Sequence, residues 1–105
     1  MTKQEQTIIN EYCVQRYDYH MKNAEPMHVM EKHNLRTCQA CVYIGDDVIF
    51  LRSYSTIVAF IDKKSREFFD VLRHVYGYTA TSAQHISKFK HDYARYFDNS
   101  FTFRA

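Results

Sequence analysis

The sequence predicts an α+β fold in which an N-terminal helix, a short second helix and a C-terminal amphipathic helix surround a four-stranded antiparallel meander. Three observations predict it: apolar residues recur at helical spacing near both ends, they alternate in the middle, and short polar turns separate the middle segments. Successive strands with such short connections pair antiparallel. We expect one small domain over residues 1–105, because this length is that of an ordinary single domain.

Two helices are expected before the strands. Thr2 and Glu5 have the spacing of a capping box, in which the hydroxyl accepts a hydrogen bond from a backbone N–H of the first turn. The helix that follows is expected to run to about Asn23. Pro26 suits the first position of a second helix, because its missing N–H would be unpaired there anyway. This short helix is expected over Met27–His33.

The first helix is apolar around nearly its whole circumference, so it needs cover on more than one side. One interpretation places it across a sheet with another helix beside it. The other is that a flank bearing Ile8, Tyr12 and Tyr19 contacts a partner or a second copy of the chain. A homodimer is therefore one of the alternatives.

The middle of the chain has strand spacing from Arg36 onward. A turn at Gly45-Asp46-Asp47 joins the first two expected strands into a hairpin, and a polar turn at 62–66 joins the last two. The four expected strands cover residues 38–44, 48–51, 57–61 and 68–73. The meander therefore accounts for nearly all of this part of the chain.

The last helix follows Gly77, with Thr81 or Ser82 expected as its N-cap. Its core-facing stripe would consist of Ile86, Phe89, Tyr93 and Phe97, and its basic outer face of Gln84, Lys88, His91 and Arg95. The alternating tail at Phe101–Arg104 has three interpretations: it frays, packs against the fold, or pairs with a sheet edge.

A candidate zinc site is formed by His28, His33, Cys38 and Cys41, which read H-x4-H-x4-C-x2-C. They supply the ligand types and number of a tetrahedral zinc site. In a strand, however, the odd separation of Cys38 and Cys41 points them to opposite faces. We therefore interpret them as ordinary strand cysteines and expect no stoichiometric metal and no cofactor.

Catalytic machinery is not expected. Ser82, His85 and Cys13 are possible nucleophiles or bases, but no nucleophile elbow, phosphate loop or HExxH motif accompanies them. The chain has only two glycines to shape a close approach of the backbone to a ligand. We therefore expect no enzymatic activity and no catalytic residues.

Basic residues form two groups, Lys63, Lys64 and Arg66 in a strand turn and Lys88, His91 and Arg95 on a helix face. With nearby tyrosines they could bind single-stranded nucleic acid. The simpler interpretation is that they are solvated surface charges, and a net charge of +2 is too close to balance to indicate a polyanionic partner. Nucleic acid is therefore not the favoured partner.

Two motifs in the second half of the chain carry a resemblance to a known family. Residues 53–59 read S-Y-S-T-I-V-A, and residues 78–89 read Y-T-A-T-S-A-Q-H-I-S-K-F. They resemble a small phage- and plasmid-borne domain of unknown function, whose members carry S-Y-x-T-x-[IV]-A and then Y-[ST]-x-T-[ST]-x-x-H-I-x-x-F. The matching residues are Ser53, Tyr54, Thr56, Val58, Ala59, Tyr78, Thr79, Thr81, Ser82, His85, Ile86 and Phe89. The spacer between the motifs is longer here than that family leads us to expect.

The resemblance implies origin from a mobile element, where short proteins without catalytic motifs commonly bind a host protein. We therefore expect an inhibitor of a host protein, with a CRISPR-Cas nuclease as the most specific target, that is, an anti-CRISPR. A small nucleic-acid-binding accessory protein is the alternative. The expected contacts are Tyr12, Tyr19, Lys63, Lys64, Arg66, Lys88, His91 and Arg95. With an odd number of cysteines and no long apolar run, the expected location is the bacterial cytoplasm, with no membrane partner.

Overall fold

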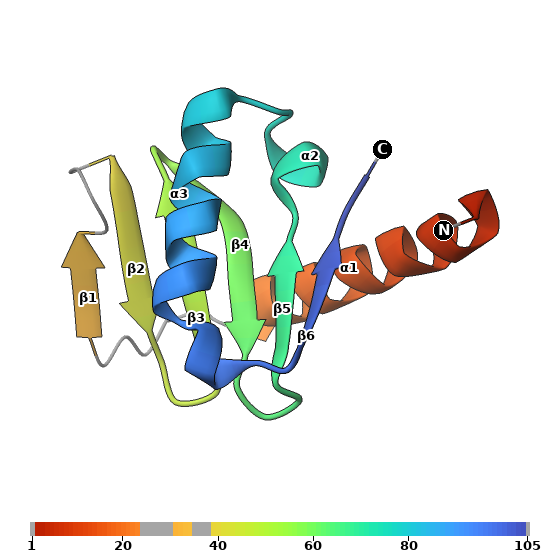
Figure 1. Ribbon diagram of the computed structural model, residues 1–105. Coiled ribbons are helices and arrows are strands. Elements are labelled where there is room, and N and C mark those ends of the chain that lie inside the picture. The colour runs from red at the N-terminus through yellow and green to blue at the C-terminus, as the bar shows by residue number, and fades with distance from the viewer. Residues whose placement is uncertain (1, 24–30, 35–38, 105) are drawn as a thin grey trace.

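A computed structural model describes residues 2–23, 31–34 and 39–104. Within these residues, the helices are α1 (Lys3–Asn23), α2 (Leu72–Val75), α3 (Ala80–Asp92) and the short 3-10 helix η1 (Ala94–Tyr96). The strands are β1 (Glu31–Asn34), β2 (Ala40–Ile44), β3 (Val48–Ser53), β4 (Thr56–Asp62), β5 (Glu67–Asp70) and β6 (Asn99–Thr102). They form one sheet in chain order, with α1 on one face and α3 on the other (Figure 1).

The expected α+β class is confirmed, but the four-stranded antiparallel meander is wrong. Strands β1 to β5 are antiparallel neighbours, and β6 joins the sheet parallel to β5. The direction of β6 follows from α3, because a helix between two strands returns the chain to the end of the sheet where β5 begins. The tail is thus a sheet strand, and its Phe101 ring packs 5.3 Å from the Tyr12 ring and 5.5 Å from the Phe69 ring.

Two expected elements differ at their ends. Glu31–Asn34 pairs with β2 as a strand, which contradicts a helix there, and the rest of that expected helix lies outside the described residues. The fourth expected strand ends at Asp70 instead of Arg73. There a carboxylate oxygen of Asp70 accepts a hydrogen bond from the Leu72 N–H at 3.1 Å, and the chain turns into α2.

The two faces of the sheet bury separate sets of apolar side chains. The buried cluster between α1 and the sheet consists of Cys13, Phe50, Phe60, Phe69 and Val71. The buried cluster between α3 and the sheet consists of Val42, Ile49, Leu51, Val58, Ala59, Ile61, Phe68, Leu72, Ile86 and Phe89. Helix α1 therefore lies across the sheet, as one interpretation of its sequence predicts, but the other long helix, α3, covers the opposite face instead of lying beside it. Part of its apolar circumference stays uncovered, since Ile8 is 60% and Tyr19 53% exposed.

Asp62 connects the C-terminal half of α1 to the end of β4. Its Oδ2 accepts hydrogen bonds from Arg16 at 2.7 Å and from His20 Nε2 at 3.0 Å, and its Oδ1 accepts from the Lys64 and Ser65 N–H groups at 3.0 Å. Burial by itself raises the pKa of this carboxyl, but the hydrogen bonds outweigh burial and hold the pKa below its usual value. Burial also lowers the pKa of His20.

Candidate functional site

The two motifs of the resemblance meet in space at one end of the sheet. Ser53 Oγ, at the end of β3, lies 2.9 Å from Ser82 Oγ and 2.9 Å from His85 Nδ1, both on α3. All three side chains are buried. We call this group the Ser–Ser–His cluster. It joins residues that are about thirty positions apart in the chain and ties the start of α3 to the sheet.

Helix α3 begins two residues earlier than expected. Thr79 has an extended backbone and is the N-cap, because its hydroxyl accepts a hydrogen bond from the Ser82 N–H at 3.2 Å. The prediction of Thr81 or Ser82 as the cap is therefore wrong. With Thr79 at the cap, the Ser82 hydroxyl is available to contact Ser53.

Tyr54 is presented at the surface beside this cluster. It belongs to the two-residue turn between β3 and β4 and has φ +56°, a left-handed conformation that is uncommon for residues other than glycine. Its N–H donates to the Gln39 carbonyl at 2.6 Å, and its ring centroid lies 6.2 Å from that of His85. The side chain is 46% exposed. Strained residues of this kind are enriched at binding sites.

Two more exposed tyrosines lie in the loop between α2 and α3. Tyr76 is 53% and Tyr78 58% exposed, on either side of Gly77, whose φ of +93° is one that a side chain would strain. The Arg73 guanidinium lies 4.7 Å from the centre of the Tyr78 ring. Figure 1 shows that this loop and the β3–β4 turn flank the N-terminus of α3 at the same end of the molecule. We call the surface formed by Tyr54, Tyr76 and Tyr78 the tyrosine end.

The side chains considered as possible nucleophiles are buried in the structure. A serine hydroxyl beside a histidine nitrogen is an arrangement that nucleophilic enzymes use, but Ser53 and Ser82 are each only 1% exposed. Cys13 is fully buried, and burial, followed by the charge of Asp70, raises its pKa to about 12. Such a thiol stays protonated at neutral pH. The arrangement is therefore suited to holding the surface turns in place.

The two predicted contact residues on α1, Tyr12 and Tyr19, differ in burial and in their partners within the fold. Tyr12 is half-buried, its hydroxyl donates to Glu67 at 2.5 Å, and burial followed by this bond raises its pKa to about 12. Tyr19 is more open, with the Arg16 guanidinium 4.7 Å from its ring centre.

The predicted basic residues lie in two separate places. Lys63, Lys64 and Arg66 occupy the β4–β5 turn, at the end of the sheet opposite the tyrosine end (Figure 1). Arg95 joins them, because its carbonyl accepts a hydrogen bond from Arg66 at 2.9 Å. Its guanidinium and the Lys63 ammonium also lie 4.9 Å and 5.7 Å from the centre of the Tyr96 ring. Arg66 pairs with Asp98 at 2.8 Å, and Lys64 with Asp47 at 3.6 Å.

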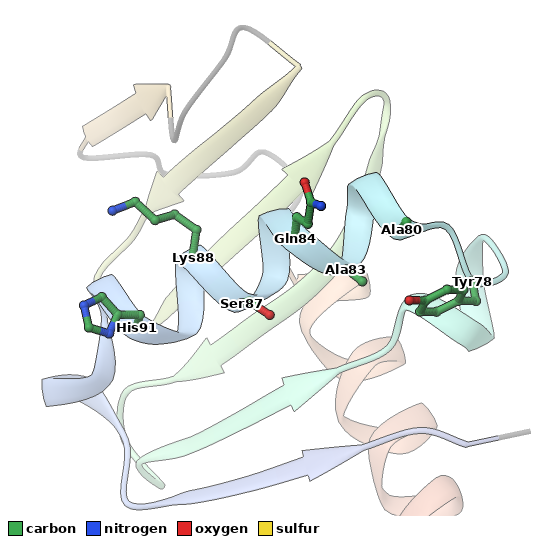
Figure 2. A pocket seen from close by; sticks show the side chains of 7 residues that line it. All are labelled: Tyr78, Ala80, Ala83, Gln84, Ser87, Lys88 and His91. Atoms are coloured by element: carbon green, nitrogen blue, oxygen red, sulfur yellow. The ribbon is translucent and has the colours of Figure 1, made fainter.

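Lys88 and His91 line a shallow hollow along the flank of α3. Figure 2 shows it running from Tyr78 at the start of the helix to Lys88 and His91 near the other end. The small side chains of Ala83 and Ser87 lie between Tyr78 and His91, and the hollow forms there because they fill little space. Lys88 also pairs with Asp92 at 3.1 Å.

The candidate zinc ligands are only partly placed. His28 and Cys38 lie outside the described residues, His33 belongs to β1, and Cys41 is buried in β2. In the part of the chain that the structure describes, no group of three or more His, Cys, Asp or Glu side chains is arranged to hold a metal ion. None of the helices described there is long and apolar enough to cross a membrane.

Sequence reasoning missed the contact between Ser53 and His85 and the exposure of Tyr76. Both motifs were recognisable, but no local pattern shows that they touch. No protein-family model matches the chain, and no curated protein or solved structure is significantly similar to it. The resemblance to the phage and plasmid domain therefore rests on the quoted residues alone.

Proposed function

We propose that the protein is a non-enzymatic product of a phage or other mobile element that binds and inhibits a host protein. A CRISPR-Cas nuclease is the most specific candidate target. The observation that supports this proposal is the tyrosine end. There, two tyrosines of the motifs, Tyr54 and Tyr78, lie at the surface instead of in the core. Tyr54 and Tyr78 are 46% and 58% exposed, although large aromatic side chains usually contribute to burial.

The chemistry of this surface suits protein binding. Tyrosine and arginine are enriched among the residues that dominate interface energies, and Arg73 stacks on Tyr78. The Ser–Ser–His cluster and the Thr79 cap hold the turns that carry these rings. A surface that is already ordered loses less conformational entropy on binding. Inhibition would follow if this surface binds the target where the target's substrate binds.

The test is co-expression with a panel of Cas nucleases, scored by co-purification and by cleavage of target DNA. We expect a stable complex and reduced cleavage with the wild-type protein, and loss of both when Tyr54 and Tyr78 are changed together to alanine. Tyr19→Ala is the matched comparison, because that tyrosine is 53% exposed on α1. Loss with Tyr19→Ala alone would move the interface to α1. If the wild-type protein neither bound nor inhibited any nuclease of the panel, the nuclease target would be refuted.

The alternative, a nucleic-acid-binding accessory protein, is favoured by the uneven distribution of charge. Residues 71–105 contain five Lys or Arg and two Asp or Glu, a net charge of +3, whereas residues 1–70 contain nine and ten, a net charge of −1. The two functions differ in salt dependence, because binding through phosphates weakens steeply with added salt.

A further inference from the structure

A small recess lies between the start of α3 and the ends of β5 and β6. It has a volume of about 200 Å³, and Arg73, Arg104, Asp70 and Thr102 are among the residues that line it. Tyr78 and Ala83 line both this recess and the hollow on the flank of α3, so the two adjoin beside the tyrosine end. We call it the arginine recess.

The recess has an excess of positive charge. Arg73 and Arg104 are exposed, and neither forms an ion pair with a carboxylate of the described residues. Asp70 is the acidic residue in the lining, and one of its oxygens accepts the Leu72 N–H. Burial raises the pKa of Asp70, while the nearby charges of Lys90, Arg104 and Arg73 act to lower it. The lining of the recess therefore carries two cations, Arg73 and Arg104, and one carboxyl group.

Both arginines are held in place by other parts of the fold. Arg73 lies over the Tyr78 ring at 4.7 Å. The backbone of Arg104 is fixed by Asn10 of α1, whose side chain donates to the Arg104 carbonyl at 2.7 Å and accepts from its N–H at 2.9 Å. A charged group positioned in advance, as the Arg73 guanidinium is, loses less freedom when it binds an anion.

We propose that the arginine recess binds an aspartate or glutamate side chain of the protein partner, so that the partner contacts the tyrosine end with an acidic segment. This inference rests on the proposed function. Guanidinium groups bind carboxylates through paired hydrogen bonds, which suits two arginines that have no such partner within the described residues. The recess is smaller than the roughly 300–1,000 Å³ of a typical ligand pocket, a size that fits one side chain.

Charge and size both favour a peptide over nucleic acid. Binding to DNA rests on neutralising several phosphates with lysine or arginine side chains, whereas the recess is lined by only two cations, Arg73 and Arg104. A single carboxylate needs only the two guanidinium groups.

The test is a titration of the full-length ¹⁵N-labelled protein with the peptide acetyl-hexaglutamate-amide, followed by backbone amide shifts in NMR spectra. We expect saturable shifts at the amides of Arg73, Ala83 and Thr102. Arg73→Gln combined with Arg104→Gln should weaken binding about tenfold or more. The matched control is Lys3→Gln combined with Lys22→Gln, which removes two exposed charges of α1 and should leave the affinity unchanged. The same spectra report whether each variant is folded.

Three outcomes would overturn the inference. Shifts could be absent at the recess, or they could persist unchanged in the double arginine variant. A ten-residue oligothymidylate could also shift the same amides at lower concentration and with steep salt dependence, which would make the recess a nucleic-acid site. Peptide binding without capture of any nuclease would refute the proposed target and leave the recess standing. Capture that needs Tyr54 and Tyr78 but tolerates the double arginine variant would refute the recess alone.

Discussion

Replacing Ser53 with alanine tests whether the Ser–Ser–His cluster holds α3 to the sheet. Ser53 Oγ is the central atom of the cluster, with bonds of 2.9 Å to Ser82 Oγ and to His85 Nδ1. Both partners are buried, at 1% and 5% exposure, so water cannot easily replace the lost hydroxyl. A buried polar group left without a partner costs about 1–3 kcal/mol. The two lost bonds, to the Ser82 hydroxyl and to His85 Nδ1, would together cost about 2–6 kcal/mol.

Part of this cost is recovered, because a serine hydroxyl can rotate toward another acceptor. We therefore expect Ser53→Ala to lower the free energy of unfolding by about 2–4 kcal/mol. Ser82→Ala leaves the bond between Ser53 and His85 intact and should cost about 1 kcal/mol. The control is Ser55→Ala, in the same turn but exposed, which should change stability by less than about 0.5 kcal/mol.

The assay is equilibrium urea unfolding followed by circular dichroism. With a slope of about 2 kcal/mol per M, in the middle of the usual range, the Ser53→Ala midpoint should fall by roughly 1–2 M. If Ser53→Ala lowered the free energy of unfolding no more than Ser82→Ala, the two bonds of Ser53 would not add to stability as we expect. A loss no larger than that of Ser55→Ala would refute the role of the cluster altogether.

Two further predictions concern Asp62. Asp62→Asn places an amide against Arg16 and His20 and should cost about 3 kcal/mol, whereas Asp98→Asn, at an exposed ion pair, should cost clearly less. Equal losses in urea unfolding would contradict the importance of burial. The second prediction is that stability falls as pH drops below about 6.5. The reason is that burial lowers the pKa of folded His20, so the unfolded chain takes up its proton first. Below about pH 4 the loss should continue, because folded Asp62 also has a lowered pKa. The urea midpoint at pH 7.5, 5.5 and 3 measures both effects, and His20→Gln should reduce the first; a midpoint that stays constant would contradict both.

Local pattern was sufficient for the elements that are regular along the chain. The capping box at Thr2 and Glu5 forms as predicted, with the Glu5 N–H 3.1 Å from the Thr2 hydroxyl, and α1 ends at Asn23. The hairpin of β2 and β3 also lies near its expected position. These features depend on neighbours a few residues apart, so the sequence contains their full signal.

Local pattern failed where a distant segment decided the outcome. Glu31–Asn34 follows a proline that suits a helix start, yet it forms β1 because β2 offers an edge to pair with. Three hydroxyl residues could each cap α3, and the choice of Thr79 depends on where the loop from α2 delivers the chain. Sequence propensity is a weak guide at such positions, because tertiary contacts readily outweigh it.

The sequence by itself determined the α+β class, the apolar sides of the long elements and the two motifs on which the proposed function rests. The tertiary structure alone decided that β6 runs parallel to β5, that Ser53 meets Ser82 and His85, and that Arg73 and Arg104 share a recess. The physical reason is range. Periodicity states which side of a helix or strand is apolar, whereas the pairing of distant segments depends on register and burial across the whole sheet. The proposed binding surface belongs to this second kind of information.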